Sequence, residues 1–347
     1  MIFITVILKE GGIMNNMTAT VKKRKKLWKA DEVVHPFRVI VHKEISDQVN
    51  SWRFIILLFI IGLTCFGSMY TALTNIGSAV QANDQEGNFL FLKLYTISDG
   101  TLPSFFVFIS FLGPLLGISL GFDTVNSEQT KGTLSRLMSQ PIHRDYLINA
   151  KFVSALTVIS VLFFALGFLF MGLGIIITGL PPTPEEFWRV VFFILVSILY
   201  VAFWLNLAIL FSVIFRQPAT SALACIAVWL FLTVFYNLIV NLIAKAIAPS
   251  AMASTHQVFR YQEIIMTLMK ILPGELYSDA TTTILMPSVR SLGPLTMEQI
   301  VGAVPGPLPL GQSLLLVWPQ LTGLIAATVF CFVLSYVTFM RREIRSR

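Results

Sequence analysis

Long apolar runs alternate with short polar connections along this chain. Six runs approach or exceed the ~20 residues that a helix needs to cross a bilayer, and they cover residues 54–76, 102–122, 152–180, 187–215, 219–243 and 314–340. No Asp, Glu, Lys or Arg lies in the middle of any of these runs. The pattern therefore predicts an all-α polytopic membrane protein with six transmembrane helices over residues 54–340.

Composition supports this class. Of 347 residues, 55% are hydrophobic and only 12% are charged, whereas soluble domains carry about a quarter charged residues. The three cysteines lie inside apolar runs and the four histidines do not cluster, so we expect neither a disulfide nor a metal site. We also find no constellation of residues that predicts a catalytic site.

The distribution of basic residues predicts the orientation. With both termini in the cytoplasm, 19 of the 25 Lys and Arg residues fall on the inner side, and the acidic residues divide equally between the two sides. This is the positive-inside pattern. It accounts for the net charge of +7 without a nucleic-acid partner. The inner segments are 1–53, 123–151, the turn at Arg216, and 341–347.

The N-terminal tail, residues 1–35, is basic. Its "KKRKKLWK" stretch, Lys22 to Lys29, is expected to face anionic lipid at the inner leaflet. Lys9-Glu10-Gly11 can be encoded by a bacterial ribosome-binding sequence just upstream of Met14. Our hypothesis is that translation starts at Met14 or Met17, which would leave residues 1–13 outside the native chain.

Residues 36–53 predict an amphipathic helix on the inner leaflet. Apolar side chains recur there at helical spacing, with Glu44 as an alternative to Ile45, and an aromatic residue marks the interface: Phe37, Val41, Ile45, Val49 and Trp52. A soluble helix packing on a loop is the alternative.

Small and amide side chains inside the spans are candidates for helix packing or for a substrate pathway. Gly113, Gly117 and Gly121 lie four residues apart on one helix face, where another backbone can approach closely. Whether that contact is within one chain or between subunits stays open. Asn206, Asn237 and Asn241 are expected to form helix-to-helix hydrogen bonds or to line a pathway.

The segment between spans two and three, residues 123–151, is polar and basic. "TKGTLSRLMSQP" predicts a short helix with Leu134, Leu137 and Met138 on one side, ending at Pro141. "IHRDYLINAKF" predicts the start of the third span, with Lys151 as an interfacial anchor. A solvated loop that only satisfies the positive-inside rule is the alternative.

This segment resembles the cytoplasmic segment of type-two ATP-binding-cassette (ABC) exporter permeases. The matching positions are Glu128, Gly132, Thr133, Leu134, Leu137, Ser139, Pro141, Ile142, Arg144 and Lys151. The resemblance implies a coupling helix that docks in a groove on a separate ATPase subunit, in an assembly of two ATPases and two permeases, the second permease being a copy or a relative. The implied coupling residues are Glu128, Lys131, Gly132, Thr133, Leu134, Arg136, Leu137, Met138, Pro141 and Arg144.

The chain has no G-x-x-x-x-G-K-[ST] phosphate loop. We therefore expect it to bind no cofactor itself, and ATP and Mg to be bound by the partner. The resemblance implies a bacterial plasma membrane. A permease-like sensing subunit and an ion-coupled secondary transporter are the alternatives, and the missing intramembrane charges count against the second.

Residues 248–313 are too polar and Pro-rich to span a membrane, which makes them an extracytoplasmic segment. Within them, apolar side chains at helical spacing predict an amphipathic helix that rests on the outer leaflet or caps the pathway: Val258, Tyr261, Ile265, Leu268 and Leu272. "LPGELYSDATTTIL", Leu272 to Leu285, also resembles the permease branch linked to multicopper-enzyme maturation and multidrug export.

Overall fold

The computed structural model describes residues 35–82, 89–98, 102–134, 139, 143–179, 181–249, 254–289 and 307–341. In these ranges the regular secondary structure is α-helical apart from one π-helical turn. The prediction of an all-α fold is confirmed. The tails at 1–34 and 342–347 lie outside the described residues.

Six helices are long and apolar enough to cross a membrane. They are α3 (Trp52–Ala82), α5 (Phe105–Gly121), α8 (Arg144–Thr178), α9 (Pro184–Ile214), the fifth span made of α10 (Pro218–Leu230), the π-turn η2 (Phe231–Phe235) and α11 (Tyr236–Ala246), and α15 (Leu310–Arg341). The six predicted spans are confirmed, and span six begins at Leu310 rather than at 314.

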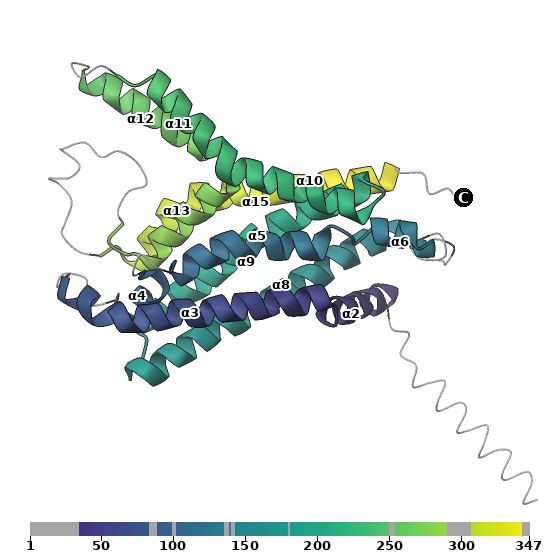
Figure 1. Ribbon diagram of the computed structural model, residues 1–347, viewed down its shortest axis with the longest axis horizontal. Helices are drawn as coiled ribbons and strands as arrows, with labels where there is room; N and C mark the ends of the chain where they lie inside the picture. Colours follow the sequence, from purple (N-terminus) through teal and green to yellow (C-terminus); the bar gives the residue numbers. More distant parts are fainter. Residues whose placement is uncertain are drawn as a thin grey trace, which may run out of the picture.

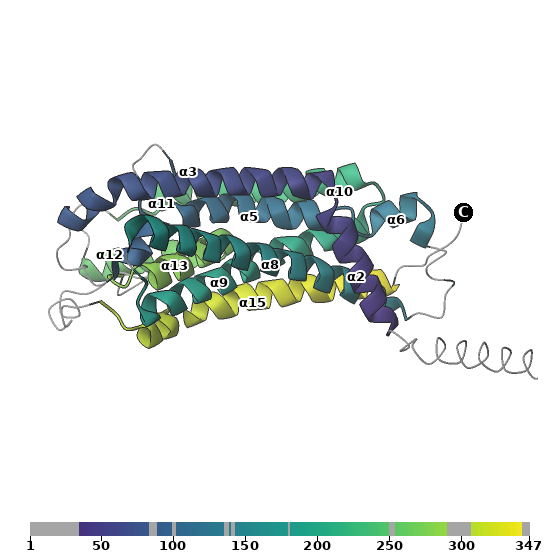
Figure 2. The ribbon, with the colours of Figure 1, turned by 90° about the horizontal axis from the view of Figure 1, so that it is seen from below.

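The long helices lie side by side (Figure 1). At one end are α2 (Pro36–Val49) and α6 (Asn126–Thr130), and we call this the α2/α6 end. Figure 2 shows α2 crossing that end of the bundle at a steep angle to α3. At the opposite end are α4 (Leu90–Thr96) and α12 (Thr255–Met269), and α15 runs from this end to the α2/α6 end.

Helix α9 is the centre of the bundle. It packs against α5, α8, α13 (Pro273–Leu285) and α15. Of an apolar 18-residue stretch in α9, 72% is buried inside the protein, compared with 17% of the corresponding stretch in the fifth span. The fifth span is therefore the most peripheral of the six, with most of its large apolar side chains exposed.

The glycine face of α5 packs against α9 within one chain, which settles the question that the sequence left open. A Cβ atom on Gly117 would lie 2.7 Å from the Val201 carbonyl oxygen, and one on Gly121 would lie 2.6 Å from the Ala208 Cβ. One on Gly113 would lie 2.9 Å from the Val201 Cγ2. These distances are shorter than van der Waals contact, so only glycine permits the two backbones to approach this closely.

Gly117→Ala is expected to destabilise the protein by about 1–3 kcal/mol, because an added methyl group in a packed contact forces the backbones apart. Gly62→Ala in α3 is the matched control, since a Cβ there meets nothing within 4 Å. Thermal unfolding in detergent measures both. Equal unfolding temperatures for the two variants would contradict the α5–α9 contact.

Part of the predicted extracytoplasmic segment packs inside the bundle. Helix α12 confirms the predicted helix at 256–272, although it ends at Met269. Helix α13, in contrast, packs between α9 and α15. Its Tyr277 is fully buried, stacks on Tyr200 with ring centroids 4.4 Å apart, and shares a 2.9 Å hydrogen bond with Ser197. A segment too polar to span is thus still a structural part of the helix bundle.

Candidate functional site

The elbow between spans two and three begins as a short helix. Helix α6 follows α5 after one turn and ends at Thr130, and Gly132 adopts a left-handed conformation with φ +68°. The left-handed Gly132 ends this first helix, and the backbone is helical again at Thr133 and Leu134, so the helix predicted in "TKGTLSRLMSQP" begins after Gly132. The third span begins at Arg144, with Asp145 in its first turn, as predicted. Arg136, Leu137, Met138 and Pro141 lie outside the described residues.

A buried lysine joins three elements at the α2/α6 end. Lys151 of α8 is 2% exposed, and its Nζ lies 2.9 Å from the Glu128 Oε1 of α6 and 3.2 Å from the Glu44 Oε1 of α2. Both carboxylates are themselves buried. Because charges removed from water are stable only when paired, this Lys151–Glu44–Glu128 triad holds the elbow and α2 on α8. Lys151 is not the interfacial anchor that the sequence predicts.

The start of the elbow is also attached to spans one and four. The Ser212 hydroxyl of α9 accepts hydrogen bonds from the backbone amides of Val125 and Asn126, at 2.9 and 3.2 Å. Arg53, at the start of α3, forms a 2.6 Å ion pair with Asp123. The elbow is therefore held by several spans at once.

Two of the predicted coupling residues point inward. Glu128 is paired with Lys151, and Leu134 is 2% exposed and belongs to the hydrophobic core. The expectations that Leu134 offers an exposed apolar contact and Glu128 an exposed charge are wrong, because both side chains are used to hold the elbow on the bundle. Lys131, Gly132, Thr133 and Arg144 are exposed, which leaves them available at this end.

Helix α2 uses one face to contact protein. It spans Pro36–Val49 rather than residues 36–53, and it packs against α8. Phe37 contacts the Tyr146 ring with centroids 6.0 Å apart. Val41 and Ile45 are half-buried, whereas Val49 and Trp52 are exposed. Glu44, which the sequence offered as an alternative to Ile45 on the apolar face, is the buried residue of α2. That α2 also lies on the inner leaflet stays a prediction.

The sequence missed a buried cation at the opposite end. Arg189 of α9 is fully buried and donates to the carbonyl oxygens of Ile284 at 2.8 Å and Leu308 at 2.6 Å, and to Glu185 at 2.9 Å. These bonds tie α9 to the end of α13 and to the start of α15. The Glu185–Arg189 spacing was a possible signal, since residues four apart pair on a helix.

The three asparagines have different environments. Asn206 is buried and donates to the Thr328 carbonyl of α15 at 3.3 Å, which is the predicted helix-to-helix bond. Asn237 donates to the Thr233 carbonyl in its own helix and lines a pocket. Asn241 is exposed.

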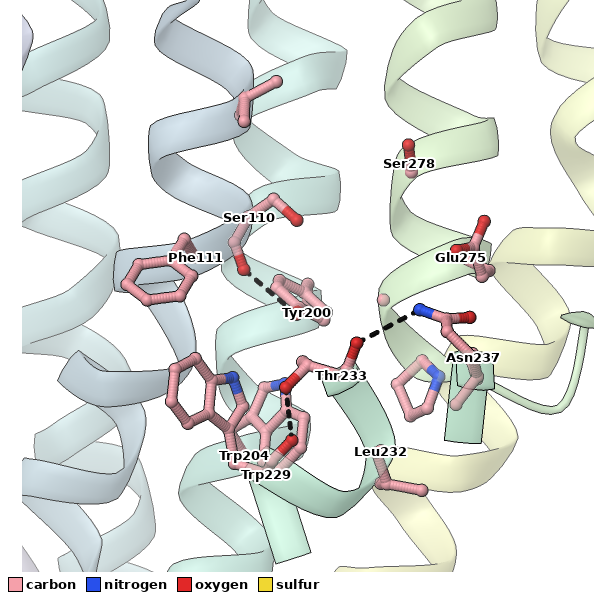
Figure 3. Close-up of a pocket in the computed structure, with 14 residues that line it drawn as sticks. Ser110, Phe111, Tyr200, Trp204, Trp229, Leu232, Thr233, Asn237, Glu275 and Ser278 are labelled. Atoms are coloured by element: carbon pink, nitrogen blue, oxygen red, sulfur yellow. Dashed lines mark hydrogen bonds between the residues drawn. The ribbon is translucent and has the colours of Figure 1, made fainter. Parts of the chain in front are cut away.

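The pocket has a volume of about 270 Å³ and lies between α5, α9, the fifth span and α13 (Figure 3). Its walls carry the aromatic rings of Phe111, Tyr200, Trp204 and Trp229. Four elements distant in sequence contribute, so the sequence patterns did not predict it. A cavity with apolar walls and a few polar groups is the usual form of a small-molecule site.

Comparisons with known proteins agree with this architecture. The model of the ABC-2 family of transporter proteins matches residues 38–344. The chain is also 24% identical over 202 residues to a probable ABC transporter permease protein, NosY, of Stutzerimonas stutzeri, covering 58% of this chain and 67% of that protein. With the family model matched from α2 to the end of span six, the chain belongs to the ABC-2 family and is a multi-pass membrane subunit of an ABC transporter.

Proposed function

We propose that this subunit couples ATP binding and hydrolysis by a separate ATPase to the export of a substrate. The α2/α6 end faces the cytoplasm with both termini, in agreement with the excess of Lys and Arg in the segments at that end. The membrane is the bacterial plasma membrane. ATP and Mg are bound by the ATPase and not by this chain.

The observation that carries the proposal is the Lys151–Glu44–Glu128 triad. An ATPase that contacts the elbow displaces α6, and the ion pairs at 2.9 and 3.2 Å make α8 and α2 move with it. Ser212 adds α9, the central helix, to the same unit. A displacement at one end of the bundle is thereby converted into a movement of the spans, as alternating access requires.

The complete exporter contains two ATPases and a second permease, either a copy of this chain or a relative. The peripheral fifth span is one surface where a second permease could pack, because apolar side chains such as Leu223, Phe231 and Leu242 are exposed along it. These side chains suit either lipid or a second subunit.

Charge reversal at the elbow is expected to remove the ATPase. In Lys131→Glu combined with Arg144→Glu, two exposed cations at the α2/α6 end become anions, which weakens docking through the charges that set register and association rate. We expect an ATPase to co-purify with the detergent-solubilised wild-type protein and its recovery to fall by at least about tenfold in the variant, a loss equivalent to ~1.4 kcal/mol.

The matched control is Lys245→Glu combined with Arg260→Glu. Both residues are exposed at the opposite end, so the change in net charge is the same. The control is expected to retain the ATPase. Absence of an ATPase from the wild-type preparation, or equal loss in both variants, would refute the proposal.

A further inference from the structure

The pocket between α5, α9, the fifth span and α13 is walled by aromatic rings from three spans. The Trp229 ring lies edge-on to the Phe111 ring with centroids 5.1 Å apart, and Tyr200 and Trp204 come from α9. Figure 3 shows these side chains grouped on one side of the pocket, with Glu275 and Ser278 of α13 on the other. An aromatic wall attracts apolar groups and, through the negative ring faces, cations.

The fifth span borders the pocket at its π-turn. Between Phe231 and Phe235 the fifth span widens from α-helical to π-helical geometry, and π-turns of this kind are frequent at functional sites. Leu232 and Thr233 in that turn line the pocket. The first turn of α13, with Pro273 and Gly274, closes the opposite side.

Buried polar atoms at the wall are left without partners. Among the described residues, neither the Trp229 indole nitrogen nor the Asn237 Oδ1 has a hydrogen-bond partner, although Trp229 is only 6% exposed. Buried polar groups are normally satisfied. Trp229 and Asn237, two residues that line the cavity, therefore each carry a buried polar atom that the described residues do not satisfy.

Glu275 brings a carboxylate to the same cavity. It is half-buried, and no Lys, Arg or His nitrogen of the described residues lies within 4.0 Å of it. Burial, and secondarily the negative charge of Asp279, raises the pKa of Glu275 above its ordinary value. The positive end of the α13 dipole offsets about half a charge, which leaves the ionised carboxylate incompletely compensated.

We infer that this pocket binds an organic cation with an aromatic or apolar body, whose charge is balanced by Glu275 and whose body packs on Trp229, Phe111 and Tyr200. The inference rests on the proposed function, since it names the substrate class that the exporter would move. An anion is disfavoured because it would lie beside Glu275. A neutral apolar ligand would leave the carboxylate uncompensated.

The test compares two probes of the same shape. Benzyltrimethylammonium and neopentylbenzene differ only in the quaternary nitrogen that replaces carbon. Binding to the full-length protein, with the subunits that co-purify, is measured by equilibrium dialysis in detergent without ATP, and free concentrations are corrected for partition into micelles. The cation is expected to bind at least about tenfold more tightly, which corresponds to ~1.4 kcal/mol, because its charge contacts both the aromatic faces and the carboxylate.

Glu275→Gln is expected to reduce this preference to near unity, whereas Glu263→Gln, which removes an exposed carboxylate of α12, is expected to keep it. An acid with a raised folded-state pKa binds protons more tightly in the native state, so its ionisation opposes folding as pH rises through that pKa. Glu275→Gln is therefore expected to unfold at the same or a higher temperature at neutral pH while it loses cation binding.

The pH dependence gives a second measurement on the wild-type protein. Protons compete with the cation for Glu275, so affinity for benzyltrimethylammonium should fall as pH is lowered through the raised pKa. The other groups that bear on this titration are Asp279, whose pKa burial raises and Lys270 lowers, and the Tyr200 phenol in the wall. In Glu275→Gln the dependence should flatten.

Equal binding of the two probes to the wild-type protein, or an unchanged preference in Glu275→Gln, would overturn the inference. If Glu275→Gln does not fold, a flat pH profile in the wild type overturns it. These results are independent of ATPase recovery with the elbow variants. A failed exporter proposal and a failed substrate class are thus told apart.

Discussion

Lys151→Met is expected to cost about 3–5 kcal/mol of stability and to release the ATPase. Removing one partner of a buried ion pair leaves the other charge buried and uncompensated, and such changes cost this much in measured proteins. Here two carboxylates, Glu44 and Glu128, lose the same cation. Thermal unfolding and ATPase co-purification from detergent measure the two effects.

Lys43→Met is the control, because Lys43 lies 3.1 Å from the same Glu44 carboxylate but is 57% exposed. An exposed pair contributes about 0–1 kcal/mol, so this variant should stay close to wild type. Equal unfolding temperatures for Lys151→Met and Lys43→Met would show that burial does not explain the contribution of the triad to stability.

A triple variant separates charge from packing. Combining Lys151→Met with Glu44→Gln and Glu128→Gln removes all three charges, and it is expected to recover much of the stability that Lys151→Met loses. It is not expected to recover coupling in full, since the bonds that make α2, α6 and α8 move together are gone. Recovery of coupling along with stability would show that packing alone transmits the displacement.

The spans were predictable because each is determined by a local property. A run of about 20 apolar residues is recognisable in any stretch of the chain, and the observed helices Trp52–Ala82 and Pro184–Ile214 begin within three residues of the predicted runs. The glycine spacing in α5 was recognisable for the same reason. The sequence did not predict that this glycine face contacts α9, because the spacing of residues on one helix does not indicate which helix packs against it.

The role of the elbow residues was less predictable. Lys151 pairs with Glu128 at a separation of 23 residues and with Glu44 at 107, so the sequence pattern around Lys151 resembles that of any interfacial lysine. The role of Leu134 was equally undetermined by the sequence, because an apolar side chain on a polar elbow can face either the bundle or a partner. In the structure it faces the bundle. The roles of Lys151 and Leu134 are therefore both determined by contacts within the folded bundle and not by the local sequence.

The pocket was not predictable from local patterns either. Its Asn237 was singled out, but Glu275 belongs to a segment that composition alone assigns to the extracytoplasmic side. Helix α13 enters the bundle because Tyr277 and Ile284 are buried against spans, and its polar C-terminal carbonyl is satisfied by Arg189. The pairing of Arg189 with that carbonyl joins residues 95 apart in sequence.

Arg189→Met is expected to destabilise the protein by about 3 kcal/mol or more. Two carbonyl oxygens, of Ile284 and Leu308, would each lose a charged donor, and each buried group left unsatisfied costs about 1–3 kcal/mol. Because Arg189 ties both α13 and α15 to α9, the loss should appear first as faster amide hydrogen exchange in residues 273–285, followed by a lower unfolding temperature.

Two further variants show whether the planar guanidinium is required. Arg189→Lys keeps the charge but replaces a fork of five donors by a point charge, so it should recover only part of the stability. Arg260→Met removes an exposed guanidinium from α12 and should have little effect. If Arg189→Lys matches the wild type in exchange and unfolding, charge alone suffices. If it behaves like Arg189→Met, the separate bonds to Glu185, Ile284 and Leu308 are what fix α13, and through it one wall of the pocket, on the central helix.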